Sequence, residues 1–106
     1  MREITDQAAL QSAVGDAPTA VLFHATWCPF CRKFRPEFER RLGSAKAPVA
    51  VEALMDDEEN PLWDLYGIAA VPTVLFFDHG VVVRRLDAKP GIGLEAGDLE
   101  QALPAR

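Results

Sequence analysis

The sequence Cys28-Pro29-Phe30-Cys31 holds the only two cysteines of this 106-residue chain, and its surroundings constrain how the chain can fold. The apolar run from Thr19 to Ala25 precedes it and suits a strand covered on both faces, as in a parallel sheet. A helical pattern follows, with Cys28 at the N-cap and Pro29 at the first helical position, where a missing N–H is harmless. The two sulfurs are therefore predicted at a strand-to-helix junction, one helical turn apart.

A disulfide between these cysteines would close a very short loop and so add little stability. A bond that forms and breaks is the better interpretation, because Cys-x-x-Cys beside a βαβ pattern indicates a redox motif. The helix N-terminus and the cation Arg32 favour a thiolate at Cys28, which we expect to be the nucleophile and the more exposed sulfur. Cys31, one turn further in, is expected to be the resolving thiol.

Other uses of the two cysteines fit the sequence less well. They could be ordinary buried thiols or zinc ligands. A zinc site needs about four ligands, and the only other soft candidates are His24 and His79, the second in a predicted turn far from the motif. We expect no metal, and no cofactor other than the redox-active disulfide between Cys28 and Cys31.

The remaining segments predict an α/β fold in one domain over residues 1–106. Further strands are expected at Pro48 to Leu54, Thr73 to Phe77 and Val81 to Arg85, the last two joined in a hairpin by Asp78-His79-Gly80. Helices are expected after a cap at Thr5 or Asp6, at Asn60 to Tyr66 and at Asp98 to Leu103, and the helix at the cysteines buries Phe34, Phe38 and Leu42. With a short extra strand near Glu3, this order predicts a mixed sheet of four or five strands with helices on both faces.

Composition excludes some classes of function. The formal charge of -5 argues against a nucleic-acid binder, which would show a basic patch. No apolar stretch reaches the roughly 18 residues of a membrane span. The first ten residues lack the apolar core of a secretory signal, so we expect a cytoplasmic location, although a processed exported form would have the same sequence. We also expect the chain to act as a monomer.

At this point the sequence resembles the thioredoxin family over nearly its whole length. The resemblance is carried by the apolar strand leading into Ala25-Thr26-Trp27-Cys28-Pro29-Phe30-Cys31, by Pro36, by Tyr66-Gly67-Ile68-Ala69-Ala70-Val71-Pro72-Thr73, and by Phe77 and Gly80. It implies a thioredoxin fold and dithiol–disulfide exchange on protein substrates.

The resemblance also implies roles for residues around the sulfurs. The bond before Pro72 should be cis, with that proline against the sulfurs and the backbone of Val71 paired to an extended substrate segment. Trp27, Pro29 and Phe30 should line the docking surface. From the residues alone, Pro72 could instead be an ordinary strand-start proline, Trp27 a core aromatic and Phe30 the first residue of the buried stripe.

Three departures from the family bear on its chemistry. Pro29-Phe30 replaces the usual Gly-Pro and is closer to the glutaredoxin pattern. The family's buried Asp and Lys match Leu22 and Ala53, so we expect an apolar core beneath the site and another base for Cys31, for which His24 is a candidate beside an ordinary packing role. The Lys89 to Leu94 loop is longer than usual and borders the docking groove.

The expected function is therefore reduction or exchange of protein disulfides, within electron transport and cell redox homeostasis. Cys28 would form a mixed disulfide that Cys31 resolves, and a thioredoxin-reductase-like flavin protein or a glutathione-based reductant would reset the pair. Two alternatives stay open at this stage. One is a glutathione-dependent, glutaredoxin-like enzyme, suggested by Pro29-Phe30. The other is a thioredoxin-fold binding module or chaperone with little turnover.

Overall fold

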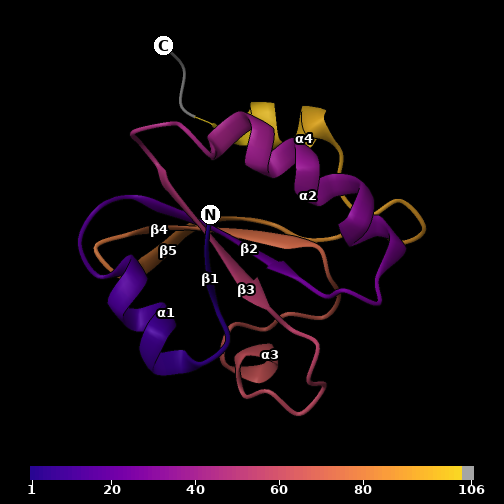
Figure 1. The fold of residues 1–106 in the computed structure, drawn as a ribbon, viewed down its shortest axis with the longest axis horizontal. Helices are drawn as coiled ribbons and strands as arrows, with labels where there is room; N and C mark the ends of the chain where they lie inside the picture. Colours follow the sequence, from indigo (N-terminus) through magenta and orange to yellow (C-terminus); the bar gives the residue numbers. More distant parts are fainter. Residues whose placement is uncertain (104–106) are drawn as a thin grey trace.

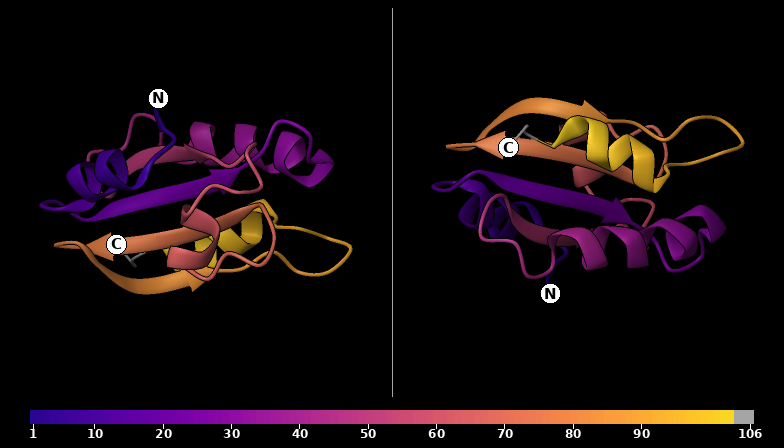
Figure 2. Two further views of the ribbon diagram at one scale, coloured as in Figure 1. Left: turned by 90° about the horizontal axis from the view of Figure 1, so that it is seen from below. Right: turned by 90° about the horizontal axis from the view of Figure 1, so that it is seen from above.

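A computed structural model describes residues 1–103 and shows a five-stranded mixed sheet between two pairs of helices (Figures 1 and 2). The elements in chain order are β1 (Arg2–Ile4), α1 (Gln7–Val14), β2 (Thr19–His24), α2 (Pro29–Leu42), β3 (Val49–Leu54), α3 (Leu62–Leu65), β4 (Thr73–Asp78), β5 (Val81–Leu86) and α4 (Ala96–Ala102). The strand order is β1-β3-β2-β4-β5, which confirms the predicted α/β thioredoxin fold and the extra strand near Glu3.

The pairing explains why β2 reads as an apolar run. It lies at the centre of the sheet, parallel to β3 and antiparallel to β4, and all six of its residues are buried. A strand in this position is covered on both faces and cannot alternate between apolar and polar residues. The cysteines follow directly after β2, so they lie at the end of the sheet where this central strand ends.

Two apolar clusters fill the space between the sheet and the helices. On the α1 and α3 face the cluster includes Phe23, Leu75 and Phe77 from the strands, and both cysteines join it. On the α2 and α4 face, Phe34, Phe38 and Leu42 of α2 pack on Leu22 of β2. The predicted buried stripe of α2 is thus confirmed.

Several local signals set the ends of the elements. Asp6 caps α1, its side chain accepting from Ala9 N at 2.8 Å. The β4–β5 turn is tighter than predicted, because Asp78 pairs with Val81 and only His79 and Gly80 remain in the loop. Both have positive φ, 51° and 82°, as a two-residue hairpin turn requires.

Two predicted helices have different bounds in the structure. The segment predicted as a helix from Asn60 to Tyr66 is helical only over Leu62–Leu65, because Asn60 turns the chain by accepting from Leu62 N at 3.0 Å. The last helix starts two residues earlier than predicted, at Ala96, where Glu95 and Asp98 form a capping box. Within the described residues, no helix has the length and apolar character needed to cross a membrane.

The stripe of α2 gives a direct test of the packing. Phe38 is fully buried, so Phe38→Ala should lower the free energy of unfolding by about 3–5 kcal/mol through lost burial and the cavity left behind. Urea unfolding followed by circular dichroism measures this. Leu65→Ala, at a side chain that is 50% exposed, serves as the control and should change stability by about 0.5 kcal/mol or less. Equal effects of the two substitutions would contradict the packing described here.

Candidate active site

Cys28 is both the N-cap of α2 and the first sulfur of the motif. Its backbone is extended, with φ -97° and ψ 116°, and its Sγ accepts a hydrogen bond from the N–H of Cys31 at 3.3 Å. That N–H is one of the first-turn donors with no partner inside the helix. The Cys28 thiol in turn donates to the carbonyl oxygen of Val71 at 3.5 Å. The sulfur is therefore held between the start of α2 and the segment that leads into β4.

Both cysteines are free thiols, and neither is widely open to solvent. Cys28 is 5% exposed and Cys31 is 1% exposed, so the order agrees with the expectation that Cys28 is the more accessible sulfur, but the difference is small. Burial raises the pKa of the Cys31 thiol to about 12, and the Cys28 sulfur beside it adds to the increase. Cys31 is thus a protonated thiol at neutral pH, as a sulfur that waits for a later step would be.

Exposed aromatic side chains surround the buried sulfurs. Trp27 is 50% exposed and Phe30 is 40% exposed, so neither is a core residue. The indole N–H of Trp27 donates to the carbonyl oxygen of Asp56 at 3.4 Å, which fixes the ring at the rim. Pro29 is also exposed. The structure therefore places all three predicted docking residues on the surface around Cys28.

On the other side of Cys28, the Val71–Pro72 bond is cis, as the resemblance implied, and both residues are buried. The Lys89 to Leu94 loop also reaches the site. A Cβ on Gly93 would lie 2.7 Å from the Cβ of Phe30, and Gly93 has a φ of +75°, so only glycine fits there. Beside it, Ile92 is 50% exposed. Sequence reasoning placed this loop near the groove but did not predict its contact with Phe30.

Arg32 acts on the loop before the helix. Its guanidinium donates to the carbonyl oxygen of Thr26 at 2.9 Å. Asp56 holds the same residue from the other side, accepting from the N–H of Thr26 at 2.7 Å and from its hydroxyl at 2.6 Å. These hydrogen bonds from the Thr26 side chain and backbone lower the pKa of Asp56. Hydrogen bonds to Arg32 and Asp56 therefore hold Thr26, the residue just before Trp27, in place.

The prediction of an apolar core beneath the site, drawn from Leu22 and Ala53, is confirmed on the face where Ala53 packs with both cysteines and is wrong on the α2 face, where Leu22 lies. Leu22 pairs with Glu52 in the parallel ladder, so these two residues share the α2 face, whereas Ala53 belongs to the cluster on the opposite face. Glu52 is 1% exposed. An ionisable side chain therefore does lie beside Leu22, on the neighbouring strand.

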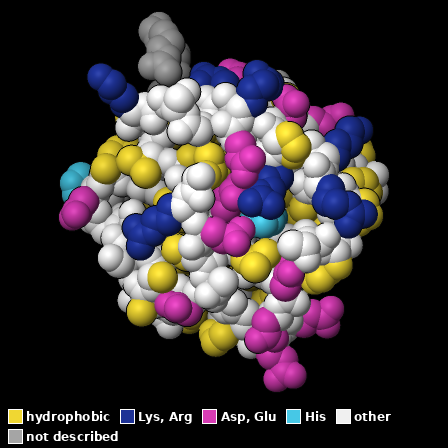
Figure 3. Space-filling model, in the orientation of Figure 1, with side chains coloured by type: hydrophobic (Ala, Val, Ile, Leu, Met, Phe, Trp, Pro, Cys, Tyr) yellow, Lys and Arg dark blue, Asp and Glu magenta, His cyan; other side chains and the backbone are white. Residues whose placement is uncertain are grey.

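Glu52 belongs to a group of charged and polar side chains between the sheet and α2. We call it the polar cluster; its members are Glu3, His24, Arg35, Glu39 and Glu52. Arg35 donates to Glu52 at 3.0 Å and to Glu39 at 3.1 Å, and lies 3.7 Å from Glu3. Figure 3 shows acidic, basic and histidine side chains gathered near the centre of the face that it draws. The arrangement supplies a cation to each nearby carboxylate.

Burial governs how the polar cluster holds its protons. It raises the pKa of Glu52 to about 7, with a further increase from its hydrogen bond to Glu39, and the Arg35 guanidinium offsets only part of this. The hydrogen bond to Glu52 and the charge of Arg35 lower the pKa of Glu39. Burial and the charge of Arg35 also lower the pKa of His24 below its ordinary 6.5. His24 is therefore neutral at neutral pH.

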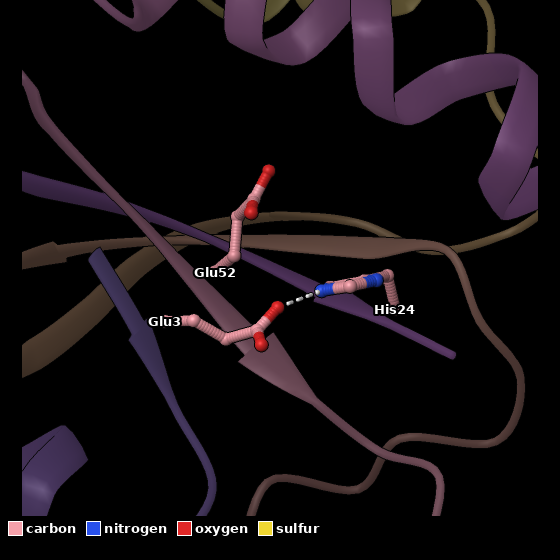
Figure 4. A group of neighbouring side chains, drawn as sticks. All are labelled: Glu3, His24 and Glu52. Atoms are coloured by element: carbon pink, nitrogen blue, oxygen red, sulfur yellow. Dashed lines mark hydrogen bonds and ion pairs between the residues drawn. The ribbon is translucent and has the colours of Figure 1, made fainter. Parts of the chain in front are cut away.

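Glu3, His24 and Glu52 come from three adjacent strands, and in Figure 4 the Glu3 carboxylate and the His24 ring point toward each other while the Glu52 side chain stands beside them. One ligand-type atom from each lies within 4.8 Å of the others, a spacing that would fit a metal ion. The guanidinium of Arg35 already provides positive charge to both carboxylates. We therefore assign the group to ion pairing.

Sequence reasoning predicted that Glu52 points to the face opposite Ala53 and named His24 as a candidate base, but it did not predict the ion pairs of the polar cluster. One signal was present, since Glu52 is the only charged residue in the run from Val49 to Leu54. A carboxylate inside a buried strand is rare unless it is paired, so it indicates a nearby cation. The helix period gives the partner, because Arg35 is one residue from the buried Phe34 and borders the apolar stripe of α2.

A dithiol at the start of a helix, at the carboxyl end of a central strand in a mixed sheet, defines a class of thiol–disulfide exchange proteins. Comparison with known proteins identifies the family. The thioredoxin family model matches residues 2–100. A thioredoxin of Alicyclobacillus acidocaldarius is 34% identical over 83 residues, covering 78% of this chain and 79% of that protein.

Longer and more distant relatives agree. A probable thioredoxin-2 of Caenorhabditis elegans is 37% identical over 71 residues, which are 67% of this chain and 47% of that protein, so this chain spans about half of that relative. The solved structure of a Plasmodium falciparum thioredoxin superposes with a TM-score of 0.81 at 23% identity, covering 95% of this chain and 94% of the other. The chain belongs to the thioredoxin family and is a thiol–disulfide oxidoreductase. Neither alternative considered from the sequence is better supported.

The raised pKa of Glu52 predicts how stability changes with pH. The folded protein holds this proton up to about pH 7, whereas an ordinary glutamate in the unfolded chain loses it near 4.5. The stability that the protonated Glu52 contributes is fully present below pH 4.5 and is lost as the pH rises through 7. Between pH 4.5 and 7 the unsubstituted protein should therefore lose stability. Glu52→Gln has no proton to lose there, so its free energy of unfolding should fall by about 1–3 kcal/mol less over the same interval.

Urea unfolding of both proteins at several pH values through that interval measures the difference. Glu58→Gln, at an exposed carboxylate after β3, is the control and should follow the unsubstituted protein. Parallel curves for Glu52→Gln and the unsubstituted protein would contradict the assignment of a raised pKa to Glu52.

Proposed function

We propose that this chain reduces disulfide bonds of other proteins, with Cys28 as the attacking sulfur and Cys31 as the resolving sulfur. The observation that carries the proposal is the hydrogen bond from Cys31 N to Cys28 Sγ at 3.3 Å. This donor and the positive end of the α2 dipole stabilise negative charge on Cys28. A thiolate there attacks one sulfur of a substrate disulfide and releases the other as a thiol.

The second step uses the sulfur one turn deeper. Cys31 loses its proton and attacks the Cys28 sulfur of the mixed disulfide, so the Cys28–substrate bond breaks as the Cys28–Cys31 bond forms. The substrate leaves as its second thiol, and the enzyme holds the two-electron oxidation as an internal disulfide. That reversible disulfide is the only redox group the proposal requires. A reductase of the thioredoxin-reductase type, or glutathione, would return the pair to dithiol.

The rim around Cys28 supports a protein as the substrate. The carbonyl of Val71 is 3.5 Å from Cys28 Sγ, so an extended segment that pairs with this backbone brings its own sulfur to the nucleophile. Main-chain pairing tolerates many sequences, and the exposed Trp27 and Phe30 add apolar contact area. We therefore propose disulfide-bearing loops of proteins as the substrates, and a role in cytoplasmic redox homeostasis and electron transport, with the chain acting as a monomer.

The two cysteines should fail in different ways when substituted. Cys28→Ser should abolish insulin-disulfide reduction by dithiothreitol above the uncatalysed rate, because no mixed disulfide can form. Cys31→Ser should form the mixed disulfide but not release it, so covalent adducts should accumulate on non-reducing gels and disappear with excess thiol. An unsubstituted protein no faster than Cys28→Ser would overturn the enzymatic proposal. Adducts equally abundant in both variants would overturn the assigned roles.

A further inference from the structure

The resolving step needs a base. Cys31 is 1% exposed and its pKa is raised by burial to about 12, so its proton must be removed as it attacks. The family's buried carboxylate is absent from β2, where this chain has Leu22. The base must come from another part of the site.

One cavity joins Cys31 to the polar cluster. It has a volume of about 450 Å³, enough for water, and its lining residues are His24, Ala25, Thr26, Cys31, Arg32, Arg35, Pro36 and Glu39. Only two of these could accept a proton at neutral pH, since the guanidinium groups stay protonated. Glu39 is a weak acceptor, because its pKa is lowered and Arg35 holds its carboxylate. Glu39 also lies eight residues along α2 from Cys31, about 12 Å at the helical rise. His24 is the remaining acceptor.

The contacts of His24 leave one nitrogen free for this role. Its Nε2 lies 3.1 Å from the carboxylate of Glu3, an arrangement that places the ring proton on Nε2. Within residues 1–103 no side chain or backbone group bonds to Nδ1. Every fully buried polar side-chain atom there has a hydrogen-bond partner, so Nδ1 is in contact with solvent. Nδ1 is therefore an accessible lone pair on a residue that lines the same cavity as Cys31.

We propose that His24, oriented by Glu3, accepts the Cys31 proton through water in this cavity during resolution of the mixed disulfide. This proposal rests on the function proposed above. The proton moves from Cys31 Sγ to Nδ1, the Cys31 electron pair forms the bond to Cys28 Sγ, and the substrate thiolate leaves with the electrons of the broken bond. His24 then returns its proton to solvent or to the leaving thiolate. Glu3 is a positioning residue, since it acts only by holding the ring.

Other charged groups also face His24. They are Glu3 from β1, Arg35 and Glu39 from α2, Glu52 from β3 and Asp56 after β3. Arg35 opposes protonation of His24, whereas Glu3 and Asp56 favour it. Burial outweighs the carboxylates, so neutral His24 is the form present when the step occurs.

The test separates resolution from the first attack. With 5,5′-dithiobis(2-nitrobenzoate), Cys28 releases one coloured thiolate as it forms the mixed disulfide, and Cys31 releases a second as it resolves it. Stopped-flow absorbance gives both rates from about pH 5 to about pH 9. We expect His24→Gln to slow the second release about 10–100-fold near pH 7 and to remove its inflection near the His24 pKa. The first release should keep its rate, because Cys28 does not use this base.

Two further variants make the result decisive. His79→Gln alters the other histidine, which is 80% exposed in the β4–β5 turn, and should change neither release. Glu3→Gln keeps a hydrogen-bonding group beside Nε2 but weakens the tautomer preference, and should slow the second release less than His24→Gln does. It also tests the proposal if His24→Gln does not fold, as judged by circular dichroism.

An unchanged second release in His24→Gln, with its pH profile intact, would overturn the proposal, as would equal slowing of both releases. If His24→Gln does not fold, an unchanged second release in Glu3→Gln would also overturn it. Failure of the proposed function gives a different result, namely no mixed disulfide at Cys28 even in the unsubstituted protein.

Discussion

The hydrogen bond from Cys31 N to Cys28 Sγ is the interaction on which the site depends. A helix N-terminus presents donors that have no acceptor within the helix, and a side chain of Ser, Thr, Asp or Asn usually satisfies one of them. Here a sulfur does so, and Pro29 at the next position removes a second donor. The group that begins α2 is thus also the sulfur that we propose as the nucleophile. A negative charge on Cys28 strengthens the cap, so the start of the helix and the reactivity of the sulfur favour the same state.

α2 carries both cysteines and is held on the sheet by two different kinds of contact. Its apolar stripe, Phe34, Phe38 and Leu42, packs over the central strand. Beside the stripe, Arg35 reaches the buried Glu52 on β3. A buried ion pair adds little net stability compared with apolar packing. Removing one partner, however, leaves an unpaired buried charge and is strongly destabilising. The apolar stripe therefore supplies most of the stability. The ion pair fixes where α2 lies over β3, and so positions the cavity that Arg35 and Cys31 both line.

The fold and the sulfurs were predictable because their signals are local. The Cys-x-x-Cys spacing, the apolar run before it and the stripe after it each lie within one or two adjacent elements. The polar cluster was not predictable in the same way, since it depends on the register between β2 and β3. Counting along the sequence matched Ala53 to the family's buried lysine, but the ladder pairs Leu22 with Glu52. A shift of one residue moves a side chain to the other face of the sheet, so a small error in matching reverses the conclusion about charge.

The observed register also changes what replaces the family's buried carboxylate. In this chain the position of the family's carboxylate on β2 is apolar, and the ionisable groups are Glu52 on β3, Glu3 on β1 at the edge and His24 at the end of β2. Glu3 is 38% exposed, whereas Glu52 and His24 are almost completely buried, so protonation of the cluster can equilibrate with solvent from one side. A base sealed beneath the sulfurs would have to exchange its proton through the packed core. A base reached from an open cavity exchanges it directly with water, and burial keeps that base neutral until a proton is offered. The loss of the central acid is therefore compatible with turnover, because this chain keeps proton-accepting groups on the α2 side of the site.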